Sequence, residues 1–468
     1  MNDIKLVNFD FFQIALILGS VHLLQNHIVM LISVINVYLH IYFFLMHGTG
    51  NINEKNQTDK ALRGANCVFH LAFYGIAGKE MLQTRQIDEI NLIGTCNLLD
   101  SCVKCGVERL VFTSSYNVVF GGQRIVNGDE NIGYFPIEKN FDSLGRCKAL
   151  AEQLVLKSNG RPLKSKGGRK LHTCAIRPAA IYGPDEEYHV PRLLNLAQKG
   201  IFLYVLGGPE VKTDWVYIDN LVQAQLLASM GLIDDIPGRQ GAPASGQVYF
   251  ISDGAPVNTF KFMQPLIEGL GYQLPKHQLS VKSAMRLAWI FWGLYGLMYP
   301  WLNKGWLPQP PFLPAEVQKV GVTHNFSILK ARQELGYVPY MEPKEGIRRT
   351  LEHWKMKQGK ELRSPELIYW IAIPAGMTLL FCSAFIPPQY LGILQWARWL
   401  ALFLFRTQYA VQTVFVVACI IHLGEAVYAW NLARRVDSVN CKGWFWQTLA
   451  LGFSSLRLLI RRSHNLGY

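Results

Sequence analysis

The sequence predicts an α/β domain built on a parallel sheet, followed by an all-α membrane region. Residues 110–115 form an apolar run that ends in hydroxyl side chains, which is typical of a buried parallel strand. Residues 149–156 carry apolar side chains at helical spacing, so we expect a helix after this strand. Beyond residue 367, long apolar stretches alternate with short polar breaks, as they do in membrane helices.

The stretch from 109 to 156 contains the candidate site. In open α/β sheets, ligands bind at the carboxyl ends of the strands. Ser114 and Ser115 end the apolar run and are therefore candidates for binding a substrate oxygen. Lys148 lies on the first turns of the following helix, and Leu144 lies one helical turn before it.

Several motifs resemble one family. The hydroxyl-ended strand, the helix start around Lys148 and the segment Arg-Pro-Ala-Ala-Ile-Tyr-Gly-Pro at 177–184 together resemble the extended short-chain dehydrogenase/reductases. The likeness is to the 3β-hydroxysteroid dehydrogenase/isomerase branch and its family 42E. Further motifs in the family's order lie at residues 50–52, 67–72, 91–95, 214–220 and 248–254. The resemblance implies a Rossmann-like parallel sheet with a small substrate lobe over residues 50–360.

The resemblance also implies an activity: NAD(P)-dependent oxidation of a CH–OH group on a steroid or sterol-like substrate, in steroid biosynthesis or metabolism. In that family, a tyrosine phenol exchanges a proton with the substrate oxygen, and a lysine ammonium one turn away lowers the pKa of the phenol. A serine hydroxyl fixes the oxygen, and the nicotinamide carries the hydride. The matching positions here are Ser114 or Ser115 for the oxygen, Lys148 for the nicotinamide ribose, and Asn51, Ala72 and Pro178 beside the cofactor.

The chain departs from this scheme at two places. Leu144 occupies the tyrosine position and can neither donate nor accept a proton. Tyr116 and Tyr134 are the nearest phenols in sequence, and each could reach the site from a loop. The glycine loop G-x-x-G-x-x-G that holds a pyrophosphate is absent, and the lone Gly48-Thr-Gly50 is expected to be a turn. The alternative function is therefore a catalytically impaired protein that keeps the fold as a sterol-binding or membrane-scaffolding module.

Residues 1–49 form an atypical apolar segment. Within it, residues 28–46 are long enough for a membrane helix, although Asn36 and His40 interrupt them. This segment stands where the relatives have two strands and a helix. We therefore expect a sheet that is incomplete at this end, with an exposed strand edge and poor folding.

The rest of the chain points to a membrane. Residues 287–302 are uncharged and rich in Trp and Tyr, which suits the bilayer interface or, alternatively, a buried core helix. A basic run at 355–363 marks a boundary, and 361–468 is the third region. We predict spans at 368–386, 391–405, 409–432 and 443–460, a pattern that resembles a small family of four-span vertebrate membrane proteins.

Charge and cysteine content agree with a cytosol-facing domain at the endoplasmic reticulum membrane. The net charge is +13, but the basic residues are dispersed without nucleic-acid motifs, so a bilayer is the expected partner and nucleic acid is not. The nine cysteines show no disulfide pattern, and Cys102 with Cys105 is a lone pair, so no metal site is predicted.

Four spans place both ends of the membrane region in the cytosol, but they place Arg434 and Arg435 in the lumen, against the positive-inside rule. His422 and Glu425 lie on one face of a predicted span. They form either a functional pair or, the reading that we favour, a contact within the helix bundle.

Overall fold

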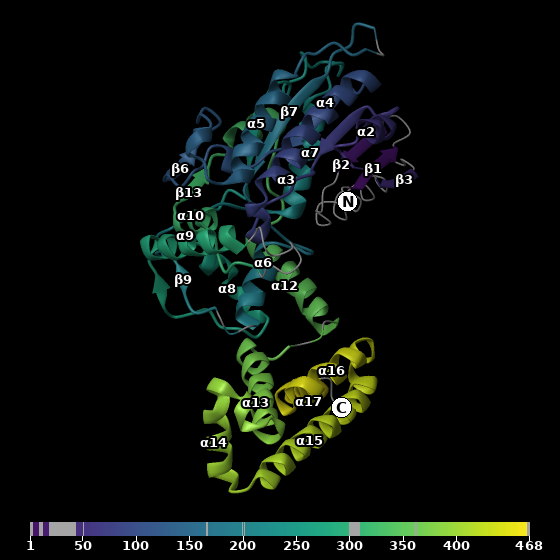
Figure 1. Cartoon of the computed structure of the whole chain (residues 1–468). Helices are drawn as coiled ribbons and strands as arrows, with labels where there is room; N and C mark the ends of the chain where they lie inside the picture. Colours follow the sequence, from purple (N-terminus) through teal and green to yellow (C-terminus); the bar gives the residue numbers. More distant parts are fainter. Residues whose placement is uncertain are drawn as a thin grey trace. The chain divides into compact units, whose positions relative to one another are not determined.

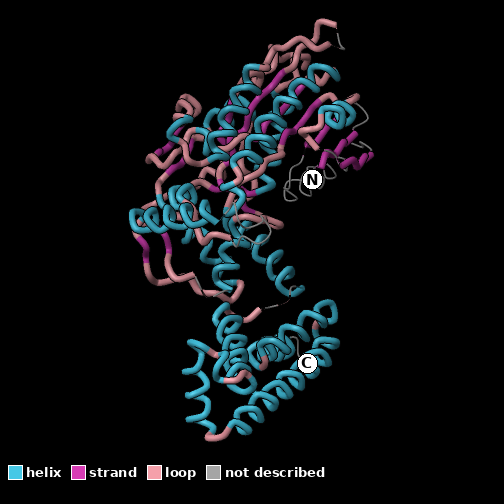
Figure 2. The backbone as a smooth tube through the Cα atoms, in the orientation of Figure 1, coloured by secondary structure: helices cyan, strands magenta, loops and turns pink. Residues whose placement is uncertain are grey.

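The computed structural model describes residues 3–8, 13–17, 44–49, 51–164, 167–198, 200, 202–298, 309–360, 362 and 364–465. The chain divides into two compact units (Figure 1). The first comprises residues 1–192 and 204–351, and the second comprises residues 193–203 and 352–468. Figure 2 shows the strands confined to the first unit, while the second is helical.

The first unit is built on a sheet of seven strands in the order β11-β7-β5-β4-β2-β1-β3. Its central strands β4, β5, β7 and β11 pair in parallel, as predicted. The strands are β1 Asp3–Asn8, β2 Gln13–Ile17, β3 Phe44–Thr49, β4 Cys67–His70, β5 Arg109–Thr113, β7 His172–Pro178 and β11 Val248–Ile251. Because these central strands run the same way, their carboxyl ends meet at one edge of the sheet.

The first 49 residues contribute three strands, which corrects the expectation of an incomplete sheet. β2 pairs in parallel with β4, and β1 pairs antiparallel with both β2 and β3. The edge of β4 is therefore covered, and the reason given for poor folding does not hold. Short apolar runs can form strands as well as helix, and periodicity alone does not separate the two. The predicted membrane helix at 28–46 lies mostly outside the described residues, and its last three residues belong to β3.

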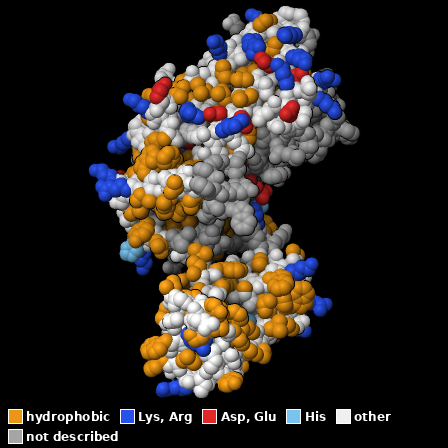
Figure 3. Space-filling view, in the orientation of Figure 1, with side chains coloured by type: hydrophobic (Ala, Val, Ile, Leu, Met, Phe, Trp, Pro, Cys, Tyr) orange, Lys and Arg blue, Asp and Glu red, His pale blue; other side chains and the backbone are white. Residues whose placement is uncertain are grey.

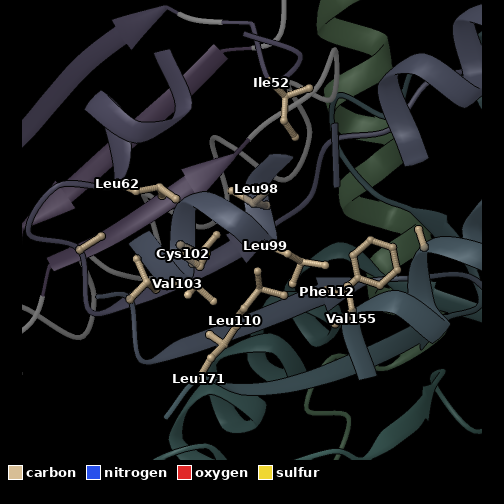
Figure 4. Packing of buried hydrophobic residues seen from close by; sticks show 14 of the residues in the cluster. Ile52, Leu62, Leu98, Leu99, Cys102, Val103, Leu110, Phe112, Val155 and Leu171 are labelled. Carbon is tan, nitrogen blue, oxygen red and sulfur yellow. The ribbon is translucent and has the colours of Figure 1, made fainter. Parts of the chain in front are cut away.

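Helices cover both faces of the sheet. The elements are α2 Lys55–Leu62, α3 Thr84–Asp88, α4 Gly94–Cys105, α5 Ser143–Lys157, α7 Ile218–Gly231 and α11 Leu329–Leu335. On one face, Leu110 and Phe112 of β5 pack with Leu99 of α4 and Val155 of α5 (Figure 4). Since strand side chains alternate, Thr113 faces the other side, where its hydroxyl accepts a hydrogen bond from Gln225 of α7. Cys102 lies in the same buried cluster as Leu99.

A smaller lobe surrounds the carboxyl edge of the sheet. It contains short parallel strand pairs, β8 with β10, β9 with β12 and β6 with β13. The bounds are β6 Ile125–Gly128, β8 Ala180–Tyr182, β9 Val205–Leu206, β10 Trp215–Tyr217, β12 Gln278–Leu279, β13 His324–Phe326, α8 Thr259–Gly269, α9 Val281–Met298 and α10 Pro314–Gly321. The helices α6 His189–Gln198 and α12 Pro343–Lys360 each begin in the first unit and end in the second. α9 corresponds to the predicted Trp-rich segment.

The second unit consists of α13 Leu367–Phe385, α14 Gln395–Phe405, α15 Gln408–Val436, α16 Cys441–Leu451 and α17 Phe453–Asn465. Of the described helices, α13 and α15 are long and apolar enough to cross a bilayer. The other two predicted spans are shorter than expected, because α14 has 11 residues and the stretch 443–460 is divided at Gly452. The four-span count therefore stays a prediction.

Candidate functional site

The site is organised by a hydrogen bond between α5 and β5. Lys148 Nζ donates to the backbone oxygen of Thr113 over 2.6 Å. Lys148 lies on the second turn of α5, and Thr113 is the last residue of β5. The lysine and the hydroxyl-bearing end of the strand therefore lie together, as the sequence predicted.

Lys148 is a buried cation, with 3% of its surface exposed. Its ammonium lies over the rings of Phe112 and Phe73, 4.8 and 5.4 Å from their centroids. Burial lowers the pKa of Lys148 to about 8, while the nearby Cys147 and Glu152 act in the opposite direction. The ammonium is thus charged at neutral pH but poorly solvated, so hydroxyl or phosphate oxygens of a ligand would stabilise it.

The two serines differ in their availability. The Oγ of Ser115 accepts a hydrogen bond from the backbone N–H of Asn117 at 3.2 Å and caps the 3₁₀ turn Tyr116–Val118. Ser114 is 4% exposed, and its Oγ has no hydrogen-bond partner among the described residues. A buried hydroxyl without a partner is costly, so of the two serines Ser114 is the one whose hydroxyl is available for a hydrogen bond to a ligand.

Leu144 is buried with 3% exposure, four residues before Lys148 on α5. Positions four apart lie on one helix face, so the tyrosine position of the scheme is filled here by an alkyl group. This position therefore supplies no group that exchanges protons.

The two candidate replacement phenols are engaged elsewhere. Tyr116 stacks on His324 with ring centroids 4.8 Å apart, and burial raises its pKa. Tyr134 donates a 2.8 Å hydrogen bond to Glu152, and burial raises its pKa too. A raised pKa makes a phenol a weaker acid near neutral pH. Neither residue therefore has the properties of the missing proton-exchange group.

Sequence reasoning missed a buried ion pair behind the site. Glu152 and Arg177 are 0% and 3% exposed, and their closest oxygen and nitrogen atoms are 2.6 Å apart. The Arg177 guanidinium also lies 5.3 Å from the ring centroid of Tyr134. Glu152 lies one turn beyond Lys148 on α5, so 144, 148 and 152 form a stripe at i, i+4 spacing. This spacing is the feature of the sequence that could have indicated that Glu152 faces the site.

The predicted cofactor residues occupy three strand ends. Ala72 follows β4, and Pro178 ends β7, and both are buried. The loop after Ala72 is fixed by Asn91, whose side chain exchanges two 2.9 Å hydrogen bonds with the backbone of Tyr74. Asn91 thus holds the backbone of this loop in place. Asn51 is exposed, and its side chain accepts a hydrogen bond from the N–H of Asn53 at 3.0 Å.

His70, at the end of β4, is a second residue that the sequence did not single out. It is 1% exposed, and burial lowers its pKa to about 3. Its Nε2 is 2.8 Å from the Thr95 hydroxyl, while its Nδ1 has no hydrogen-bond partner in the described part of the chain. Together with Ser114 Oγ, it is an unsatisfied polar atom at the carboxyl edge of the sheet.

These residues fit the nicotinamide half of a dinucleotide. A buried ammonium and a hydroxyl without a partner among the described residues both lie at the carboxyl end of β5, where such a ligand binds in open α/β sheets. The diphosphate half lacks this support, because no glycine-rich loop follows β2 in the sequence. Binding of a dinucleotide would therefore depend on the residues that fit its nicotinamide half.

Comparison with known proteins gives two matches to family models. Residues 43–281 match the 3-beta hydroxysteroid dehydrogenase/isomerase family, and residues 368–461 match Transmembrane protein 254. Short-chain dehydrogenase/reductase family 42E member 1 of Danio rerio is 42% identical over 335 residues, which cover 71% of this chain and 84% of that protein. The Homo sapiens protein of the same description is 46% identical, covering 62% of this chain and 72% of its own length.

Two further similarities extend to other proteins. The 3beta-hydroxysteroid-dehydrogenase/decarboxylase isoform 1 of Arabidopsis thaliana is 34% identical over 69% of this chain and 70% of its own. Among solved structures, MoeE5 in complex with UDP-glucuronic acid and NAD is 20% identical with a TM-score of 0.47, covering 66% of this chain and 85% of that one.

Proposed function

Because this chain belongs to the 3-beta hydroxysteroid dehydrogenase/isomerase family of oxidoreductases, we propose that it is a membrane-bound protein that binds NAD(P) and oxidises the CH–OH group of a steroid or sterol-like substrate. The supporting observation is the contact of buried Lys148 with the end of β5, beside the unpartnered hydroxyl of Ser114. The relatives whose names include a hydroxysteroid support a sterol-like substrate.

In this proposal, the residues present bind and orient. The Ser114 hydroxyl donates to the substrate oxygen, and the Lys148 ammonium binds the ribose hydroxyls beside the nicotinamide. The cofactor, when bound, accepts the hydride from the substrate carbon. With Leu144 at the tyrosine position no phenolate takes the hydroxyl proton, which passes to water instead, and loss of general base catalysis slows such a reaction by about 10² to 10⁴-fold. We therefore expect slow turnover.

A second candidate function follows from Leu144 itself. The same fold could bind a sterol and a nucleotide without catalysis, as an impaired enzyme that serves as a sterol-binding or membrane-scaffolding module. The buried alkyl side chain at the proton-exchange position favours this alternative. The two candidates share the binding site and differ in the chemical step.

Membrane attachment belongs to the same proposal. α9 exposes Trp289, Ile290 and Trp292, which are 44%, 57% and 50% accessible, so it is not a buried core helix. Figure 3 shows hydrophobic side chains gathered over this helix and over the second unit. An aromatic, apolar helix at the bilayer interface would give an apolar substrate a route from lipid. We place the first unit on the cytosolic side of the endoplasmic reticulum membrane.

The test uses the full chain in mild detergent, with binding and turnover measured separately. NADH and NADPH binding is followed by the change in nucleotide fluorescence, and turnover is followed by transfer of deuterium from a 3-deuterated sterol to NAD(P). Leu144→Tyr restores a phenol one turn from Lys148, and Leu144→Phe is the control of similar size without a hydroxyl.

The outcomes separate the candidates. Micromolar nucleotide binding, with turnover raised about 10² to 10⁴-fold by Leu144→Tyr but not by Leu144→Phe, supports the oxidoreductase. Binding without turnover in both the natural chain and Leu144→Tyr refutes it in favour of the binding module. No nucleotide binding refutes the proposed cofactor.

A further inference from the structure

The helices of the second unit fall into two length classes. At about 1.5 Å per residue, α13 and α15 reach roughly 28 and 43 Å, against a hydrocarbon core of about 30 Å. Only 17% and 11% of their most apolar windows are buried, unlike the core helices of soluble proteins. α16 and α17 have 11 and 13 residues, so each covers only about half of the membrane.

The start of α16 and the end of α17 lie close together, next to the C-terminal end of α15. Asp437 directly follows α15, and its carboxylate accepts a 2.8 Å hydrogen bond from Trp444 near the start of α16. The same carboxylate pairs with Arg462 near the end of α17, also at 2.8 Å. Since α16 starts where α17 finishes, the two helices run antiparallel and enter and leave at one end of the unit.

The turn between them is at Gly452. Its φ of +56° lies in the left-handed region that glycine adopts without strain. The flanking turns contact each other, because the hydroxyls of Thr448 and Ser455 are 3.0 Å apart. The tip lies against His422 and Glu425: a Cβ added to Gly452 would be 2.8 Å from His422 Nε2 and 2.9 Å from Glu425 Oε2.

The position of His422 gives the depth of the tip. His422 is the middle residue of α15, which runs from Gln408 to Val436, so the tip lies beside the midpoint of this helix. His422 Nδ1 is 3.1 Å from the Leu449 carbonyl oxygen. The helix break leaves this carbonyl without the backbone N–H donor that it would have in a continuous helix. The Ser454 hydroxyl likewise donates to the Leu451 carbonyl. These bonds meet the requirement that irregular backbone inside a bilayer be satisfied by the protein.

We propose that the second unit crosses the membrane twice, through α13 and α15, and that α16 and α17 form a re-entrant hairpin whose basic rim contacts anionic lipid headgroups of the cytosolic leaflet. The hairpin brings to one end the exposed residues Arg434, Arg435, Lys442 and Arg461. In a four-span arrangement Arg434 and Arg435 would face the lumen. With the hairpin, they lie on the same side as the basic run before α13, in agreement with the positive-inside rule.

Single cysteines distinguish this topology from four spans. Ile393 lies between α13 and α14, Tyr409 is the second residue of α15, and Val439 lies between α15 and α16. The three side chains are 90%, 82% and 87% exposed. Each is changed to Cys in a full chain whose natural cysteines are Ser, and sealed microsomes are treated with a membrane-impermeant maleimide before and after permeabilisation. A glycosylation sequon inserted at the same places gives an independent readout of the lumenal side.

We expect Val439→Cys to react in sealed microsomes, and Ile393→Cys and Tyr409→Cys to react only after permeabilisation. Only the sequons at 393 and 409 should then be glycosylated. Four spans would place 409 on the cytosolic side and 439 in the lumen, and that result in either readout would overturn the hairpin. Reaction of all three from one side would overturn it as well.

The lipid contact is tested on the full chain in nanodiscs of mixed phosphatidylcholine and phosphatidylserine. Lipids that remain bound after mild detergent extraction are counted by mass spectrometry. We expect a several-fold enrichment of phosphatidylserine that the triple variant Arg434→Gln, Arg435→Gln, Lys442→Gln loses and that Arg406→Gln, on the opposite side, retains. Equal enrichment in the triple variant would overturn the lipid contact. Neither test depends on nucleotide binding or turnover.

Discussion

Replacing Lys148 by Met should stabilise the first unit. Burial lowers the pKa of Lys148 from 10.5 to about 8, and at about 1.4 kcal/mol per pKa unit the charged form costs roughly 3 kcal/mol at pH 7. Met has a similar length and carries no charge, so the variant avoids most of this cost. Between pH 8 and 10.5 the unfolded chain binds more protons than the folded one, so the natural chain gains stability as pH rises and the advantage of Met fades.

The assay is amide hydrogen exchange of β5 in the nucleotide-free protein, which reports the local free energy of opening, measured at pH 7 and pH 9.5. Lys157→Met, at an exposed position of the same helix, is the control and should change the free energy by less than about 0.5 kcal/mol. A Lys148→Met variant less stable than the natural chain at pH 7, or an advantage independent of pH, would refute the account of Lys148 as a buried cation whose desolvation destabilises the fold. The same variant should weaken nucleotide binding.

Three further predictions concern other buried groups. Arg177→Met leaves the Glu152 carboxylate buried without its cation and should destabilise the first unit by about 3 to 5 kcal/mol in thermal or urea unfolding. Adding Glu152→Gln should recover most of this loss. A loss below about 1 kcal/mol would contradict the importance of the ion pair. Gly452→Ala should lower the thermal stability of the second unit, whereas Gly424→Ala, which meets no atom within 4 Å, should not, and equal effects would argue against the tight turn. Burial lowers the pKa of His70 to about 3, so below pH 6.5 the unfolded chain takes up a proton that the folded chain does not. The free energy of unfolding should therefore fall as the pH drops from 6.5, and it should fall less steeply in the His70→Gln variant.

Local signals predicted the centre of the first unit well. The strand at 110–113 and the helix after 143 follow from apolar spacing, and the contact between Lys148 and the strand end follows from the rule that ligands bind at carboxyl edges. Leu144 could be identified as a departure by counting one turn back from Lys148. The parallel pairing of the central strands confirms the predicted sheet, and the family model that matches residues 43–281 confirms the predicted family.

Features that depend on long-range contacts could not be predicted in this way. The partner of Glu152 is 25 residues away, and nothing local indicates that Arg177 faces it. The apolar run at 443–460 was predicted to be one span, yet a glycine divides it, and the contacts of Asp437 with Arg462 and of Thr448 with Ser455 show that the chain returns. The first 49 residues contain apolar runs compatible with either strand or helix, and the choice depends on the free edge of β4.

The acceptor that holds Lys148 is a main-chain carbonyl, and this has a consequence for substitutions around it. No substitution at position 113 removes a backbone oxygen, so the ammonium keeps its anchor however the side chains around it drift. A phenol introduced at position 144 would therefore meet an ammonium that is already anchored one helical turn away.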